Sequence, residues 1–435
     1  MKPDLDRLYD YVTGDEDARV CRDIPEAACR HQPRNFFAYL LANLLNKVAD
    51  EITSAKLVLP WMLGALGAPV ALTGFLVPIR EAGVLLPQLA VAAAVRHRPR
   101  RRGVWLLGGA LSGLALAGMA FVAGTLEGAA AGWAVLALLV IFSLARGLCS
   151  VAAKDVLGKT VSKSRRGALM GTSAGLGGVA VLLVGLALGA TDLAAAGGGV
   201  FVALLLGAAL LWGLALASFA AIVEEPGATE GGGNAFGVAL QHLALLRTDA
   251  GFRGFVWTRI LLLSVALAPP YYILLAQAHT GGGVQGLGWL VVAAGLGASI
   301  SSPFWGRMGD RSSRTVMALA AGGAGVLGLV TVAASWLELP GIDSPWPWAA
   351  AILLLTVLHS GVRLGRKVYL VDMATAENRA ALVAVSNTVI GVAMLLAGAI
   401  GVAGNRIGAV GLLLLLSLLA FLAAWRARYL PEVSG

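Results

Sequence analysis

Apolar residues run through this chain in long segments, and short polar turns separate them. A helix needs about 20 mostly apolar residues to cross the hydrocarbon core of a membrane. By that measure the pattern predicts an all-α membrane protein with twelve transmembrane helices in two six-helix halves. The predicted helices cover 35–63, 68–95, 103–124, 132–153, 167–190, 196–222, 252–279, 286–308, 315–337, 347–370, 380–404 and 407–428.

Polar sequence at both ends and in the middle divides the chain into five parts. The linker begins rich in glycine and ends with Phe236, Leu240, Leu243 and Leu246 at helical spacing, which predicts a helix along the membrane surface. The parts are an N-terminal tail (1–34), a first six-helix half (35–222), a linker (223–251), a second six-helix half (252–429) and a C-terminal tail (430–435).

Composition excludes a soluble protein. The chain is 58% hydrophobic and 13% charged, and its mean hydropathy is +0.80, whereas soluble domains are about 25% charged. The net charge of +9 does not indicate nucleic-acid binding, because the bases lie in short turns and form no continuous face. No spacing of His, Cys, Asp or Glu indicates a metal site, and no nucleotide-binding motif or nucleophile with a base appears. We therefore expect no cofactor and no enzymatic activity.

Lys and Arg are distributed very unevenly between the two sides of the predicted bundle. The turns on one side, with the linker and the C-terminal tail, hold twenty of them, and the opposite turns hold Arg406 alone. Cytoplasmic loops carry such an excess of bases. We expect both termini and the linker to be cytoplasmic, in a bacterial-type inner membrane.

The two halves carry a weak internal repeat. At an offset of 213 residues, 154–171 aligns with 367–384, so that Lys154 meets Lys367 and Arg166 meets Arg379. Because six helices is an even number, both halves enter the membrane from the same side. This predicts a parallel 6+6 repeat about an axis along the membrane normal.

The turn between the second and third helices of the second half reads G-x-x-x-D-R-x-x-R, at Gly306, Asp310, Arg311 and Arg314. With the twelve helices, the repeat and the linker, this turn resembles the signature of the major facilitator superfamily of transporters. The resemblance implies a gate on the cytoplasmic side, in which Asp310 pairs across the gate and the two arginines anchor the turn. A plain cytoplasmic turn would explain the arginines but not Asp310.

The first half departs from that signature. In the repeat, position 97 is equivalent to Asp310 but holds histidine. Position 93 is equivalent to Gly306 but holds alanine. This predicts a gate carried mainly by the second half. Arg146 lies where drug and proton antiporters carry an R-x-x-Q-G arginine, but the sequence continues "RGLCS". That departure weakens an assignment to proton-driven multidrug export.

Ionisable residues within the predicted helices are candidates for function, because each costs about 2.5–3.5 kcal/mol to insert. In the first helix Asn43, Lys47, Asp50 and Ser54 recur at helical spacing, a polar stripe that we expect to face a cavity between the halves. The second helix carries Arg80 and Glu81 after Pro78. Without those near the turns and tails, the ionisable residues at membrane depth are six bases and three acids, namely Lys47, Lys56, Arg80, Arg146, Arg259 and Arg363 with Asp50, Glu51 and Glu81.

Two interpretations of these charges remain open. In one, they form a neutralised network that holds helices together, because buried charges are usually paired. In the other, Asp50, Glu51 or Glu81 takes up the coupling ion, and the surplus of bases favours an anionic or zwitterionic solute. The residues expected to line the solute cavity are Asn43, Lys47, Ser54, Arg80, Arg146, Arg259, His359, Arg363 and Asn387.

The resemblance and the charges together predict a monomeric secondary active transporter in the lipid bilayer. We expect it to move a small solute by alternating access, coupled to a proton or another ion. Two alternatives stay open at this point: a proton-driven exporter of drugs or lipophilic compounds, and a membrane receptor or assembly factor that transports nothing.

Overall fold

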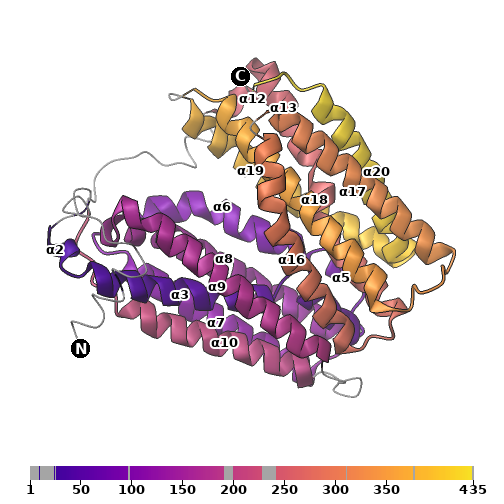
Figure 1. Cartoon of the computed structure of the whole chain (residues 1–435), viewed down its shortest axis with the longest axis horizontal. Helices are drawn as coiled ribbons and strands as arrows, with labels where there is room; N and C mark the ends of the chain where they lie inside the picture. The colour runs from indigo at the N-terminus through magenta and orange to yellow at the C-terminus, as the bar shows by residue number, and fades with distance from the viewer. Residues whose placement is uncertain are drawn as a thin grey trace.

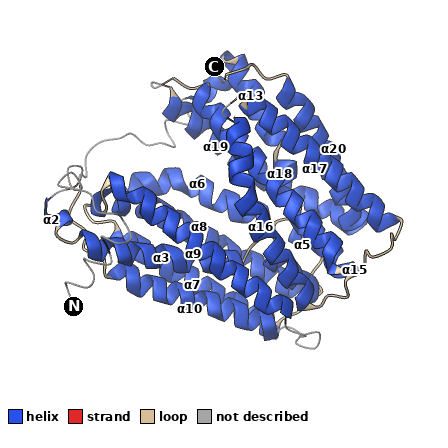
Figure 2. Ribbon diagram, viewed as in Figure 1, coloured by secondary structure: helices blue, strands red, loops and turns tan. Residues whose placement is uncertain are grey.

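The structure is a computed structural model built from helices alone, and no strand occurs among the described residues (Figures 1 and 2). The structure describes residues 9, 24, 26–96, 98–190, 199–227, 242–309, 311–375 and 378–433. The helices of the first half are α2 (Glu26–Cys29), α3 (Gln32–Ile52), α4 (Val58–Ala65), α5 (Val70–Thr73), α6 (Leu76–Arg96), α7 (Arg102–Thr125), α8 (Gly128–Thr160), α9 (Lys163–Ala190) and α10 (Gly199–Ala220). Those that follow are η1 (His242–Ala244), α12 (Leu245–Thr248), α13 (Ala250–Leu261), α14 (Leu263–Leu267), α15 (Pro269–His279), α16 (Val284–Gly309), α17 (Ser313–Trp336), α18 (Pro345–Asp372), α19 (Arg379–Gly398), η2 (Ala399–Ala403) and α20 (Gly404–Arg428).

The membrane-protein class predicted from the sequence is confirmed, but a count of twelve spans is not. Within the described part of the chain, nine stretches are long and apolar enough to cross a membrane. The last of them, Ala381–Arg428, is 48 residues long and includes α19, η2 and α20. Helix α3 is not among the nine, because Lys47, Asp50 and Glu51 fall within one turn of it.

Prolines interrupt three of the predicted helices where they remove a backbone donor and crowd the carbonyl four residues earlier. Pro60 accounts for the break between α3 and α4 at residues 53–57, and Pro78 for the break between α5 and α6. Pro269 and Pro270 begin α15. Gly408, with a φ of 66°, supplies the left-handed turn near the start of α20.

The pattern of helix packing is repeated in the two halves. In the first half α8 packs on α6 and α7, and in the second half α18 packs on α16 and α17. Likewise α10 packs on α7 and α3, as α20 packs on α17 and α13. The halves meet along two symmetry-related pairs, α9 with α16 and α6 with α19. These contacts are those of a parallel 6+6 repeat, as the sequence predicted.

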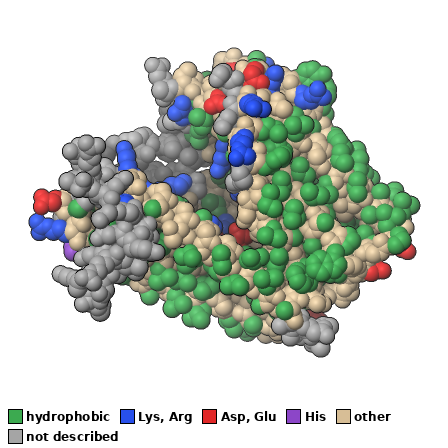
Figure 3. All heavy atoms as spheres, in the orientation of Figure 1, with side chains coloured by type: hydrophobic (Ala, Val, Ile, Leu, Met, Phe, Trp, Pro, Cys, Tyr) green, Lys and Arg blue, Asp and Glu red, His purple; other side chains and the backbone are tan. Residues whose placement is uncertain are grey.

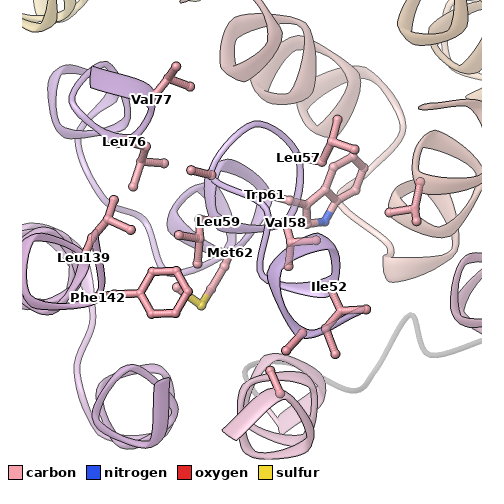
Figure 4. Close-up of a cluster of buried hydrophobic side chains, with 14 of the residues drawn as sticks. Ile52, Leu57, Val58, Leu59, Trp61, Met62, Leu76, Val77, Leu139 and Phe142 are labelled. Atoms are coloured by element: carbon pink, nitrogen blue, oxygen red, sulfur yellow. The ribbon is translucent and has the colours of Figure 1, made fainter. Parts of the chain in front are cut away.

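A cluster of buried apolar side chains surrounds the break in the first helix (Figure 4). Trp61 and Met62 of α4 are fully buried, and Phe142 of α8 lies beside Met62. Leu76 and Val77 complete the cluster from the start of α6. This packing holds residues 53–57 in place, so polar side chains in the break are presented from a rigid support.

The two halves touch at one side of the bundle and separate at the other. We call the side with the turns 98–101 and 161–162 the basic side, and the opposite side, with Glu127 and Asp343, the acidic side. At the acidic side Gln277 donates to the carbonyl of Trp61 at 2.9 Å, which joins α15 to α4. Between the halves the surface is hollowed, with Lys and Arg side chains along the hollow (Figure 3).

Candidate functional site

A cavity of about 540 Å³ lies between the two halves. Its walls come from α3, the break after α3 and α9 on one side, and from α15, α16 and α18 on the other. The charged and polar side chains that line it are Lys47, Glu51, Ser54, Lys56, Ser299, Thr356, His359, Ser360 and Arg363. Of the predicted solute-cavity residues, the structure therefore brings Lys47, Ser54, His359 and Arg363 to one site, together with the coupling candidate Glu51.

Glycines of α9 make room for the side chain of Lys47 and for the cavity itself. A β-carbon on Gly177 would lie 3.3 Å from Cδ of Lys47, so the lysine stem passes over the glycine. Gly178 also lines the cavity, and a β-carbon there would meet nothing within 4 Å. The glycine-rich sequence of α9 thus leaves the cavity wide where α3 and α9 cross.

A second group of charges is partly buried outside the cavity lining and joins three helices of the first half. Asp50 Oδ2 accepts from Arg146 at 2.6 Å and from Arg80 at 3.4 Å. The guanidinium of Arg80 lies 5.3 Å from the ring centroid of Phe142, and that of Arg146 lies 4.8 Å from the ring of Trp212. These contacts tie α3 to α6 and α8.

Other predicted residues also lie in contacts between helices rather than in the cavity wall. Asn43 donates to Ser173 Oγ of α9 at 2.8 Å. Arg259, whose residue is 6% exposed, donates to Ser386 Oγ at 2.5 Å and to Asn387 Oδ1 at 3.4 Å, which joins α13 to α19. The sequence predicted that Asn43 and Asp50 face the cavity with Lys47 and Ser54. In the structure, residues of neighbouring helices bind both side chains instead.

Lys56 is the cavity residue with an acidic partner. Its Nζ lies 3.0 Å from Glu81 Oε1, and both side chains are partly exposed. By contrast, the side chains of Lys47, Glu51, His359 and Arg363 form no hydrogen bond or ion pair with any described residue. Lys47 and Glu51 come from the first half and His359 and Arg363 from the second. The cavity thus holds unpaired charge on both of its walls.

The predicted gate turn is described in part, because Asp310 lies outside the described residues, as does His97 of the equivalent turn. Arg314 Nε lies 2.8 Å from Glu432 Oε2, and its guanidinium also donates to the carbonyl of Leu430. Arg311 is exposed, and a β-carbon on Gly306 would meet nothing within 4 Å. Arg314 therefore anchors the turn to the C-terminal tail.

The first half has an equivalent anchor that the sequence analysis missed. The carboxylate of Glu224, which follows α10, accepts from the backbone N–H groups of Arg101 and Arg102 at the start of α7. Lys159 of α8 lies 3.2 Å from the same carboxylate. Arg101 aligns with Arg314 in the repeat, so in each half an acid after the sixth helix binds the turn before the third. The sequence signal is an acid four residues after the end of each sixth helix, in "VEEP" and "LPEV".

Within the described residues, no three His, Cys, Asp or Glu side chains come together as a metal ion would need. The charged cavity therefore offers an ion or solute two kinds of group: unpaired bases from both halves, and one unpaired carboxylate.

Comparison with known proteins identifies the class of fold. No protein-family model matches the sequence, and no curated protein sequence matches it at a significant level. Solved structures of membrane transporters do match. A D-xylose–proton symporter is similar over 92% of this chain and 99% of its own, with a TM-score of 0.68 and 14% identity. The nucleoside transporter NupG is similar over 91% and 98%, with a TM-score of 0.67 and 12% identity.

The inward-open form of the xylose transporter XylE from E. coli is also similar, over 92% of this chain and 97% of its own, with a TM-score of 0.66 and 14% identity. The chain therefore has the fold of the major facilitator transporters, as the sequence resemblance predicted. The identities are low, so the likeness defines the fold and leaves the solute to the chemistry of the cavity.

Proposed function

We propose that this protein is a secondary active transporter that moves a small anionic or zwitterionic solute by alternating access. The observation that carries the proposal is the position of Lys47 and Arg363. The two bases line one cavity from opposite halves, and neither is paired with a described residue. An anion between them contacts both halves at once, so its binding favours the arrangement that encloses it.

The balance of charge supports an anion. The cavity wall carries Lys47, Lys56 and Arg363 against Glu51, and Glu81 neutralises Lys56 from behind. With a neutral His359 the site keeps one net positive charge, which rises to two when Glu51 is protonated. A cationic solute would meet repulsion at this site, whereas a carboxylate or phosphate would be attracted.

Of the three acids considered for ion coupling, Glu51 fits best. Asp50 is held by two arginines and Glu81 by Lys56, so a proton on either would break an existing ion pair. Glu51 lines the cavity without such a partner. We infer that Glu51 takes up the coupling proton, and that Asp50, Arg80 and Arg146 act as a structural brace.

The remaining assignments follow from the sequence. We propose that the basic side is cytoplasmic, in a bacterial-type inner membrane, so that the cavity faces inward in this structure. We also propose that the five parts of the chain have the limits predicted from the sequence and that the protein is a monomer. Gly306, Asp310, Arg311 and Arg314 form the proposed inner gate, with Arg314 already anchored to the C-terminal tail.

Transport by purified protein in proteoliposomes, with and without a pH gradient, tests the proposal. The probes are succinate, lactate and inorganic phosphate as anions, glycine as a zwitterion, and tetraethylammonium as a cation. Flux of an anion or of glycine is expected, and Lys47→Gln and Arg363→Gln should each reduce it at least tenfold. Arg406→Gln, which removes an exposed base of the acidic side, is the matched control and should leave flux unchanged.

The alternatives give different results in the same assay. A preference for tetraethylammonium would contradict the anion proposal and favour a drug exporter. Absence of flux with every probe and with a pool of bacterial metabolites would favour a receptor or assembly factor.

A further inference from the structure

A second, smaller cavity adjoins the central one. It has a volume of about 350 Å³ and lies between α16 and α18 of the second half. Ser360 and Arg363 line both cavities, so the two spaces share one wall. The full lining is Ser301, Trp305, Ser360, Arg363, Leu364, Lys367 and Val368.

The charge in this second cavity is entirely positive among the described side chains. Arg363 and Lys367 lie four residues apart on α18 and thus on the same face of the helix. Both side chains are exposed, and neither forms a hydrogen bond or ion pair with a described residue. Like charges at this spacing repel each other, so an anion between them would remove a repulsion that the protein alone leaves in place.

The other side chains suit a small oxyanion. Ser360 has a hydroxyl with no hydrogen bond to a described residue, and it lies on α18 between the two cavities. Trp305 uses its Nε1–H on the carbonyl of Val357 at 2.7 Å, so it presents its ring rather than a donor. The site therefore offers two cations and a hydroxyl against an apolar wall, as carboxylates and phosphates require.

We propose that this cavity is a loading site for the solute, which binds there as a carboxylate or phosphate between Arg363 and Lys367. Arg363 then passes the anion to the central cavity, because its side chain borders both. This inference rests on the proposed function, since it concerns the path of the same anionic solute. It adds Lys367, which the sequence analysis named only as the repeat equivalent of Lys154.

The test measures the local potential with charged thiol reagents, so it needs no knowledge of the solute. Val368 lines only the second cavity, and Ala294 lines only the central one. Val368→Cys and Ala294→Cys are made in full-length protein whose three native cysteines are replaced by serine or alanine. Each is treated with the anionic reagent MTSES and the cationic reagent MTSET, and the ratio of the two rates is measured. The ratio is used because a nearby base makes a thiol more reactive toward both reagents alike.

At Val368→Cys the anionic reagent should react faster than its relative rate with a free thiol predicts. Adding Lys367→Gln should lower the ratio about tenfold there, since one unit charge at about 6 Å changes each rate about threefold in opposite directions. The same substitution should change the ratio at Ala294→Cys less than twofold. Arg363→Gln should lower the ratio at both positions. An unchanged ratio at Val368→Cys after Lys367→Gln would overturn the proposal.

A lipid head group could supply the same phosphate chemistry, and vesicle composition distinguishes the two sources. Inorganic phosphate should slow MTSES at Val368→Cys in vesicles of zwitterionic lipid alone. Slowing that occurs only with phosphatidylglycerol would assign the cavity to lipid and overturn its loading role. If these tests show an anion site in the second cavity but no anion is transported, the proposed function is contradicted and the anion site is supported.

Discussion

The Cα atom of Gly401 lies 2.6 Å from the position that a β-carbon on Gly74 would occupy. Gly74 closes α5 in the first half, and Gly401 lies in η2 of the second half. The two halves therefore meet backbone to backbone at the acidic side, and any side chain at either position would force them apart. This contact exists only while the acidic side is closed, so it stabilises the arrangement in which the cavity opens to the basic side.

Gly74→Ala should shift the protein toward the arrangement that opens on the acidic side. The added methyl group cannot be accommodated without separating α5 from η2, because it would meet backbone rather than a flexible side chain. The shift is read as lower reactivity of a cysteine at Val368 and higher reactivity of one at Ala71. Gly171→Ala is the control, since a β-carbon there meets nothing within 4 Å. Equal behaviour of the two variants would contradict a role for the contact.

Much of the fold could be predicted from the sequence, because hydrophobic length and proline position act locally. Pro60 and Pro78 mark the breaks in the first two helices. Two polar residues of the first break, Ser54 and Lys56, line the cavity. The number of spans could not be confirmed in the same way. Asp50 lowers the hydropathy of α3 and is tolerated there because Arg80 and Arg146 on other helices neutralise it, whereas Lys47 and Glu51 of the same helix face the cavity.

The candidate site was less predictable, because helical spacing gives the face of a residue but not its partner. Lys47 and Asp50 share one face of α3, yet Lys47 reaches the cavity beside Gly177 while Asp50 meets Arg146 of α8. Which base meets which acid depends on the distances between helices that are far apart in the sequence. The role of Glu224 was missed for the same reason, since its partners lie more than 60 residues earlier in the chain.

Asp50→Asn should destabilise the protein strongly. The side chain of Asp50 is 18% exposed and holds two guanidinium groups. Removal of one partner from a fully buried ion pair costs about 3–5 kcal/mol, and this partly buried group should lose somewhat less. Thermal unfolding in detergent should show a lower midpoint than for the wild type. The double variant Asp50→Asn, Arg146→Gln should be no less stable than the single variant, because it removes a cation that would otherwise stay unpaired. If the stability losses of Asp50→Asn and Arg146→Gln simply added in the double variant, the structural role of this ion pair would be contradicted.

Glu224→Gln and Glu432→Gln form a matched pair, because the two acids occupy equivalent places in the repeat. The side chain of Glu224 is 1% exposed and binds two backbone N–H groups, so its loss should cost about 2–3 kcal/mol. Glu432 and its partner Arg314 are each about a third exposed, and such pairs contribute less than about 1 kcal/mol. Unfolding midpoints of the two variants should therefore differ clearly. Midpoints lowered equally would show that burial does not separate the two anchors.

Glu51→Gln should remove the pH dependence of anion binding. In the wild type, protonation of Glu51 adds one positive charge to the cavity, so affinity should be highest at low pH and fall about three- to tenfold as pH rises through its titration. Glutamine is neutral at every pH, and the variant should keep the low-pH affinity throughout. Calorimetric titration of whichever probe anion is transported, at several pH values, measures this.

Transport by the same variant separates binding from coupling. Glu51→Gln should still exchange solute across the membrane at equal concentrations, but a pH gradient should no longer drive accumulation, because no proton moves with the solute. Glu81→Gln is the control: it frees Lys56 from its partner 3.0 Å away, so the affinity for the anion should rise at every pH while the pH dependence remains. Accumulation driven by a pH gradient in Glu51→Gln would assign the coupling proton to another group.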